Sequence, residues 1–459
     1  MAVLALSLSL TAISFSRGDP LPPESAATTS SAPTPATLGK ILFFDTKLSV
    51  PRGLACANCH APDAGWTNSN SADNLLHGVS SGAVAGRFGN RNAPTISYAS
   101  YIPTGPPGYD PAVSAFVGGL FWDGHATDLP NQATFPLQNP NEMNNIVHDL
   151  PDPALVVQEV SAGSTGKLFK QVYGEDVFTQ STSDVFNLVT EAIAEFEQTA
   201  EVSPFTSKYD AYLLGKVKLS AAEMAGLRLV TGSETGRPGG PPTAKSALCV
   251  ACHGIPSDPS QGPDLWTNTC YANIGVPRNP GNPYYKMTNA RTDPLGYNPD
   301  GIDYIDLGLG GYYYTLLGLP PGNMGAGSDG RGDYLQINGT FKAPSFRNAD
   351  KRPSADFVKA YMHNGAFKSL KQIVHFYNTR NLTSVPGEVI DFTQPNPYDG
   401  LRGTPLWDSP EYLNPETLQN PAGIPGSQGG QVGNLGLTND EENDIVAFLK
   451  TLSDGYLGR

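Results

Sequence analysis

Two short motifs with the same spacing of cysteine and histidine stand out in the chain. They are CANCH at residues 56–60 and CVACH at residues 249–253, and together they use four of the five cysteines. The spacing C-x-x-C-H is typical of haem c attachment, because the two thiols add across the two vinyl groups of one haem. The adjacent histidine then lies beneath the iron as its proximal ligand. The sequence therefore predicts two covalently bound haem c groups, held by the following residues: Cys56, Cys59, His60, Cys249, Cys252 and His253.

Two other kinds of site use the same residue types. A pair of zinc half-sites could take four thiolates and two histidines, and an isolated C-x-x-C could be a redox dithiol. Two motifs that lie far apart in the chain and that each end in Cys-His favour haem attachment over both alternatives. The fifth cysteine, Cys270, is expected to be a buried free thiol.

The composition indicates a loop-rich protein that does not bind nucleic acid. Among 459 residues there are 50 Gly and 41 Pro, well above ordinary usage, which predicts long connections between modest amounts of regular structure. The formal net charge of −14 argues against nucleic acid, which selects basic surfaces. An acidic surface is instead compatible with a basic partner protein.

The first 37 residues are expected to lie outside the folded region. Residues 2–15 form a stretch of apolar, Ser and Thr residues that is similar to the hydrophobic part of an export signal, although no basic residues precede it. The alternative for this stretch is the remnant of a membrane-proximal anchor. Residues 20–37 are rich in Ser, Thr, Pro and Ala, which is typical of a flexible linker. Haem c attachment occurs outside the cytoplasm, so we expect a periplasmic or otherwise exported protein.

Helical patterns recur in the two halves of the chain. Apolar residues follow helical spacing over residues 184–200, over residues 219–230 and in a last helix that begins at Thr438. The second and third of these helices begin with a capping-box signature, a Ser or Thr followed three residues later by Glu.

Each half therefore contains a helix, a haem motif, long loops and a closing helix, which is a weak internal duplication. We expect a mainly α protein with two cytochrome c-like haem domains and long loops. The domains would be residues 38–203 and residues 204–459, and we assign no regular structure to residues 254–340.

A further segment, FWDGHATDLPNQATFPLQNPNEM at residues 121–143, carries a family signature. It resembles the inter-domain segment of the bacterial di-haem cytochrome c peroxidases and their MauG relatives. Other segments resemble the same family in the same order, so that the resemblance covers the chain after residue 37. They are LGKILFFD (38–45), RNAPT (91–95), NIGVP (273–277), FKAPSFRN (341–348), YMHNGAFKSLKQIVHFYN (361–378) and LTNDEENDIVAFLKTL (437–452). The resemblance implies that the first haem domain is peroxidatic and that the second transfers electrons.

The resemblance also implies roles for individual residues. Trp122 matches a tryptophan that couples the two haems electronically, Gln132 and Glu142 match the distal pair over the peroxidatic haem, and Pro136 matches a proline that shapes that pocket. Chemistry supports the assignment of Glu142, because peroxide cleavage needs a base to take a proton and an acid to return it. One partly desolvated carboxylate can do both. Without the motif, a lone Glu would be read as a solvated surface residue and Trp122 as plain core.

A calcium ion between the domains is implied as well. Its ligands would be the side chain of Asn92 and the backbone carbonyls of Val358 and Ala360. The family usually has a proline near the position of Ala360, so this chain departs from the pattern there.

Two positions bear on the subtype. Tyr377 stands where the peroxidases commonly have a Met ligand of the second haem and where MauG-like members have Tyr, so we expect Tyr377 as the sixth ligand, with Met362 or Met324 as alternatives. His77 lies near where many peroxidases place a His that occupies the first haem iron at rest, and MauG-like proteins lack it. A surface histidine is the alternative for His77. The two positions therefore indicate different subtypes.

Two further histidines lie in the matched segments. His125 stands where the family usually has Arg, which leaves a haem-propionate contact there in doubt. His363 matches a family histidine near the second haem, and we expect it in a supporting position.

The leading hypothesis is a peroxidase that reduces hydrogen peroxide to water with electrons from a small cytochrome c or cupredoxin. The alternative is a MauG-like oxidase that uses peroxide equivalents to modify side chains of a partner protein. A pure electron carrier would not need the pair Gln132 and Glu142, so this third class ranks low. A homodimer is possible in either enzyme class.

Overall fold

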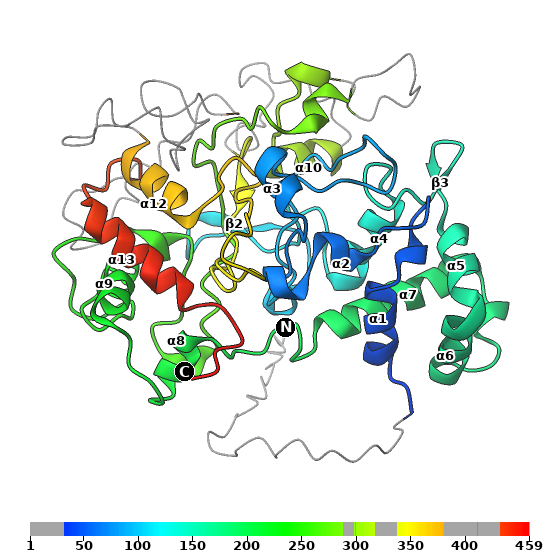
Figure 1. Ribbon diagram of the computed structural model, residues 1–459, viewed down its shortest axis with the longest axis horizontal. Coiled ribbons are helices and arrows are strands. Elements are labelled where there is room, and N and C mark those ends of the chain that lie inside the picture. The colour runs from blue at the N-terminus through cyan, green and yellow to red at the C-terminus, as the bar shows by residue number, and fades with distance from the viewer. Residues whose placement is uncertain are drawn as a thin grey trace, which may run out of the picture. The chain divides into compact units, whose positions relative to one another are not determined.

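Helices and long loops make up most of the chain that the structure describes (Figure 1). The computed structural model describes residues 32–287, 298, 300–316, 337–380, 411 and 432–458. Apart from Ala32, these residues belong to one compact unit, Pro33–Arg459. Its α-helices are α1 (Pro35–Phe43), α2 (Cys56–Cys59), α3 (Ser71–Leu76), α4 (Leu129–Gln138), α5 (Pro153–Ser161), α6 (Gly163–Tyr173), α7 (Thr182–Glu197), α8 (Lys208–Leu213), α9 (Ala221–Thr231), α10 (Leu309–Leu316), α12 (Leu370–Thr379) and α13 (Asn439–Lys450).

The strands of the described chain are short and form two-stranded antiparallel pairs. β1 (Gly108–Asp110) pairs with β2 (Ala115–Val117), β3 (Ile146–Val147) with β4 (Leu150–Pro151), and β5 (Tyr271–Ala272) with β6 (Phe341–Lys342). The mainly α character expected from the sequence is confirmed.

The predicted helices are found close to their expected bounds. The prediction over 184–200 corresponds to α7, that over 219–230 to α9, and the last helix to α13. The predicted capping boxes at Ser220 and Thr438 are present. In the region 254–340, where the sequence assigned no structure, the described residues include β5 and α10.

The same helix crossing occurs in both halves of the chain. α1 packs against α7 and α9 packs against α13, as Figure 1 shows on its right and left sides. A Cβ on Gly39 of α1 would lie 1.7 Å from the Ala192 carbonyl oxygen, and one on Gly226 of α9 would lie 2.0 Å from the Asp444 carbonyl oxygen. Only a glycine therefore allows these backbones to approach so closely.

Each crossing lies beside its own hydrophobic core. One large buried cluster is drawn entirely from residues between Leu38 and Val202, and includes the inner faces of α1 and α7. The other is drawn entirely from residues between Tyr209 and Leu452, and includes those of α9 and α13. The apolar side chains of the two halves are thus largely segregated.

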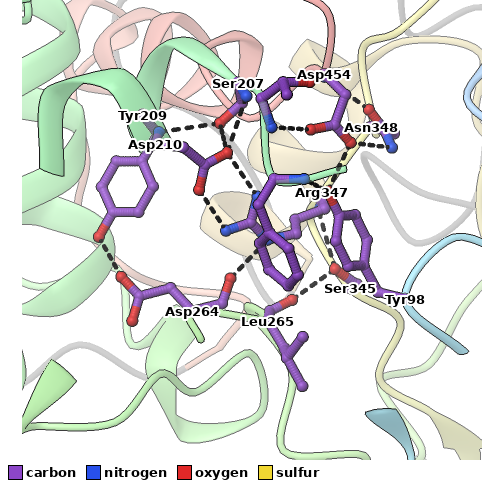
Figure 2. Close-up of polar contacts among 12 residues, drawn as sticks. Tyr98, Ser207, Tyr209, Asp210, Asp264, Leu265, Ser345, Arg347, Asn348 and Asp454 are labelled. Atoms are coloured by element: carbon purple, nitrogen blue, oxygen red, sulfur yellow. Dashed lines mark hydrogen bonds and ion pairs between the residues drawn. The ribbon is translucent and has the colours of Figure 1, made fainter. Parts of the chain in front are cut away.

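A buried polar network joins the two halves (Figure 2). Arg347 is 1% exposed and forms a bidentate ion pair with Asp210, at 2.8 Å and 3.0 Å. Its guanidinium also lies 4.9 Å from the ring of Tyr98, whose hydroxyl donates to Asp454 at 2.7 Å. Burial raises the pKa of Asp210, but hydrogen bonds and charge from Arg347 outweigh burial and hold that pKa below its usual range. Side chains from both halves thus complete one buried, ionised cluster.

The close helix contacts at Gly39 and Gly226 predict that alanine at either position destabilises the protein. Gly39→Ala and Gly226→Ala should each lower the free energy of unfolding by about 2 kcal/mol, because a methyl group at either site overlaps a backbone carbonyl. The measurement is guanidinium unfolding of the haem-loaded protein, followed by circular dichroism. Gly108→Ala is the control, because no atom lies within 4 Å of its Cβ position. Equal midpoints for Gly39→Ala and Gly108→Ala would contradict the crossing.

Candidate functional site

The first C-x-x-C-H motif lies in the wall of a large cavity. Cys56 and Cys59 lie three residues apart on α2, so both side chains lie on one side of a helical turn. Together with His60 they line a cavity with an empty volume of about 2390 Å³, counted to its open mouth. The His60 Nδ1 lies 3.2 Å from the Trp66 carbonyl oxygen. With Nδ1 as the donor in that bond, Nε2 is left to bind a metal.

The second motif has the same arrangement in a second cavity. Cys249, Cys252 and His253 line an empty volume of about 1370 Å³. The His253 Nδ1 lies 2.8 Å from the Pro344 carbonyl oxygen, and its ring stacks on Phe346 at a centroid distance of 3.9 Å. The hydrogen bond again orients Nε2 for metal binding.

These residues fit haem c rather than the alternatives. Each cavity offers two thiols and one imidazole that its hydrogen bond orients, which is the donor set of one haem c. Across the described part of the chain, no three His, Cys, Asp or Glu side chains gather as a zinc site requires. Cys270 is buried and free, as expected.

The distal residues named from the sequence meet in the first cavity. α4 carries Gln132 and Pro136, and the turn that follows it carries Glu142; all three line the cavity. The Glu142 amide donates to the Asn139 carbonyl oxygen at 3.0 Å, which fixes this turn. Burial raises the pKa of Glu142 to about 7. A carboxyl group with such a pKa can both accept and donate a proton near neutral pH.

Trp122 lies in the wall that the two cavities share. It lines both of them and is 8% exposed. Its indole Nε1 donates to the Asn92 carbonyl oxygen at 2.8 Å, and its own carbonyl accepts from the Lys342 amide at 2.9 Å. Trp122 is therefore held between the sites through both its indole and its backbone.

The second cavity contains two of the three candidate axial ligands. Tyr377, on α12, and Met362 both line it, whereas Met324 lies outside the described residues. Burial raises the pKa of Tyr377 well above its usual range. The geometry thus leaves both Tyr377 and Met362 in place to reach a haem.

His77 lies outside the first cavity, whereas the calcium candidate Asn92 lies in its wall. His77 follows α3, its ring meets Phe88 edge-on at 4.9 Å, and it is not among the residues that line the first cavity. The Asn92 Nδ2 lies 2.9 Å from the Ala360 carbonyl oxygen. The Val358 carbonyl oxygen instead accepts from Asn74, at 2.9 Å. The structure thus brings Asn92 and Ala360 together.

Sequence reasoning missed one buried acid in the first cavity and one base between the cavities. Glu197, the last residue of α7, is 3% exposed and lines the first cavity, and burial raises its pKa to about 8. An acid at the end of an apolar helix face was the available signal. Lys342 lines both cavities, and its Nζ donates to the Gly119 carbonyl oxygen at 2.6 Å.

The two motifs predict the haem count directly. Intact-mass measurement of the exported wild type should show two haem masses above the polypeptide. Cys56→Ala combined with Cys59→Ala should lose one of them, because no thioether can form at that site. Cys270→Ala, which removes the free thiol, should keep both. Two haems in the double variant would refute the assignment of the first motif.

Three comparisons place the chain among known proteins. A family model described as di-haem cytochrome c peroxidase matches residues 33–218. The methylamine utilization protein MauG of Paracoccus denitrificans is 30% identical over 422 residues, which cover 91% of this chain and 88% of that protein. The cytochrome c551 peroxidase of Nitrosomonas europaea is 32% identical over 263 residues, or 56% of this chain and 64% of that protein.

The crystal structure of the diheme peroxidase BthA from Burkholderia thailandensis matches with a TM-score of 0.65 at 28% identity, covering 92% of this chain and 86% of that one. With two haem attachment motifs, each in its own cavity, the chain belongs to the di-haem cytochrome c peroxidase and MauG family.

Proposed function

We propose that this oxidoreductase reduces hydrogen peroxide to water in the first cavity, with electrons from a small redox protein. The observation that carries the proposal is the half-buried Glu142, whose pKa desolvation raises to about 7, in the cavity that contains the first C-x-x-C-H motif. Cys56 and Cys59 would hold the haem there, and His60 would be its proximal ligand. When bound, the haem supplies an open iron position and the electrons that cleave the peroxide bond.

The surrounding side chains would handle the protons and the orientation of the substrate. Glu142 would take a proton from one peroxide oxygen and return it to the other, which converts a poor leaving group into water. The Gln132 amide can hydrogen-bond to the bound peroxide, and Pro136 shapes the cavity from the same helix.

We infer two cytochrome c-like domains, with the peroxidatic haem in residues 38–203 and the electron-transfer haem in residues 204–459. The segregated cores and the repeated glycine crossing support this division. Electrons would enter at the second haem, held by Cys249, Cys252 and His253, and pass Trp122 to the first.

A calcium ion beside the shared wall is also proposed, with Asn92, Val358 and Ala360 as ligands. Support comes from the Asn92 amide, which lies 2.9 Å from the Ala360 carbonyl oxygen. The oxygen and nitrogen of an amide are assigned from hydrogen bonding, and rotation would turn Oδ1 towards that carbonyl. Amide and carbonyl oxygens are ordinary calcium ligands.

We further propose that the protein works in the periplasm or elsewhere outside the cytoplasm. Support comes from the need for haem c attachment and from the signal-like residues 2–15. No described helix is long and apolar enough to cross a membrane. The net charge of −14 favours an electron donor with a basic docking surface.

A MauG-like oxidase is the second candidate, and Tyr377 is the observation that favours it. The tyrosine lies half-buried in the wall of the second cavity, where the resemblance implies Tyr in MauG-like members. In this version the oxidising equivalents of peroxide would act on side chains of a partner protein. Mixing the fully oxidised protein with one equivalent of peroxide separates the candidates, because a gated peroxidase needs one electron first.

Replacing Glu142 tests the acid–base role. Glu142→Gln should lower the rate of peroxide turnover by about 100-fold or more, because the amide cannot exchange the proton. The wild-type rate should rise as pH increases through about 7, where the carboxylate becomes ionised, and the variant should lose this rise. Steady-state kinetics across pH measure both effects. Glu197→Gln, a buried acid in the same cavity, should cost much less; equal losses in the two variants would disprove a special role for Glu142.

Replacing Tyr377 tests the second axial ligand. Tyr377→Met should raise the midpoint potential of the second haem, because methionine ligation favours the reduced iron. A spectroelectrochemical titration measures the change. Met362→Leu is the matched control in the same cavity and should leave the potential unchanged. A shift in Met362→Leu with none in Tyr377→Phe would identify the methionine as the ligand.

A further inference from the structure

His125 lies between the first cavity and solvent. Its side chain is 27% exposed, yet it also lines the cavity together with Glu142. The ring stacks on Phe121 at a centroid distance of 4.1 Å, with an angle of 8° between the planes, and meets Phe135 edge-on at 4.6 Å. These two aromatic contacts hold the imidazole in one orientation at this boundary.

A carboxylate fixes the hydrogen bonding of this ring. The His125 Nδ1 lies 2.5 Å from Asp123 Oδ1, and the other carboxylate oxygen pairs with Arg91 at 2.7 Å. Burial raises the pKa of Asp123, but Arg91 and His125 outweigh burial, so the pKa lies well below the usual range and the group stays ionised. Nδ1 is therefore the donor in this bond, and the described residues give Nε2 no hydrogen-bond partner. The second ring nitrogen is free to exchange protons.

The proposed reaction has a proton requirement that Glu142 does not meet. Reduction of one hydrogen peroxide to two waters consumes two electrons and two protons. Glu142 only moves a proton that peroxide already carries, so both consumed protons must come from solvent. A group is needed that meets both solvent and the cavity and that can both gain and lose a proton, as an imidazole can.

We propose that His125 stores and delivers one of these protons. Its Nε2 takes a proton from solvent when an electron enters the first haem, which forms the imidazolium. The Nε2–H bond then breaks as the proton passes to the oxygen that is becoming water, and the neutral ring with Nδ1–H on Asp123 is restored. The inference rests on the proposed peroxide reduction and adds the source of a proton to it.

The charges around the ring favour this cycle. Arg91 pairs with both Asp123 and Asp306, so these three groups carry one net negative charge when His125 is neutral. Protonation of His125 cancels that charge, and an added electron nearby increases the gain. Three other groups that line the cavity compete for protons near neutral pH. They are Lys342, whose pKa burial lowers to about 7, and Glu142 and Glu197, whose pKa values burial raises to about 7 and about 8.

The departure from the family pattern supports the assignment. An arginine at this position would keep its positive charge at every physiological pH and could not release a proton. A histidine supplies a similar charge only when protonated. The substitution of His for the family's Arg thus changes a fixed charge into an exchangeable one.

The test is the pH dependence of the midpoint potential of the first haem, measured by spectroelectrochemical titration of the two-haem protein. The wild-type potential should fall with rising pH with a slope of one proton per electron around neutral pH. His125→Asn should flatten this slope, because the amide cannot take up a proton. His125→Arg should also flatten it while keeping the charge. His148→Asn is the matched control, because His148 is exposed in the turn between β3 and β4, outside both cavities, and it should keep the wild-type slope.

Each outcome decides the proposal. An unchanged slope in His125→Asn would overturn it and would assign the proton to Lys342, Glu142 or Glu197. A slope that survives in His125→Arg would overturn it as well. Peroxide turnover is measured separately on the same samples. A wild type that turns over no peroxide would overturn the proposed function. If its potential still showed the slope that depends on His125, the proton uptake would stand, so the two failures are distinguishable.

Discussion

A single layer of residues separates the two cavities, and much of the remaining structure holds that layer in place. Trp122, Lys342, Ala343 and Pro344 line both cavities. Electron transfer between two cofactors requires them to be close and fixed, and the fold has to supply both conditions. The indole of Trp122 donates a hydrogen bond to Asn92, and the Pro344 carbonyl oxygen lies within hydrogen-bond distance of His253. The segment that follows Pro344 leads to the buried Arg347. The polar network in Figure 2 therefore anchors the same segment that separates the redox sites.

The local parts of this arrangement could be predicted from the sequence. Periodic apolar residues and capping signals fixed α7, α9 and α13, and the cysteine spacing predicted the walls of both cavities. α10 and β5 were missed because their Gly- and Tyr-rich sequences have no clear period. The fact that Gly39 and Gly226 lie at helix crossings could not be read from the chain, since a close approach depends on the partner helix. Glu197 was missed for a related reason, because a lone acid at a helix end usually faces solvent.

Two acids line the first cavity, and burial raises the pKa of both, but they lie at different places in the fold. Glu142 lies in the turn that follows α4, whereas Glu197 ends α7, and the charges of both act on Cys56, that of Glu197 more strongly. Burial is the cause of the raised pKa of both acids, whereas Arg347 lowers the pKa of Asp210, so each of these two acids is harder to ionise than an exposed carboxyl group. An incoming electron pair adds negative charge there, and proton uptake is the natural compensation. In the proposed reaction, His125 brings in a proton from solvent and Glu142 moves a proton between the two peroxide oxygens.

The wall of the first cavity has a consequence for the making of the protein. The core of the N-terminal half is complete within Leu38–Val202, so a ribosome that has released this part has delivered every apolar residue of that core. The cavity itself is closed by later residues: Leu265, Thr267, Thr269, Lys342, Ala343, Pro344 and Ser345. A half-made or truncated chain would therefore leave the first cavity open on this side. The wall of the first cavity and the second C-x-x-C-H motif thus become available in the same late part of synthesis.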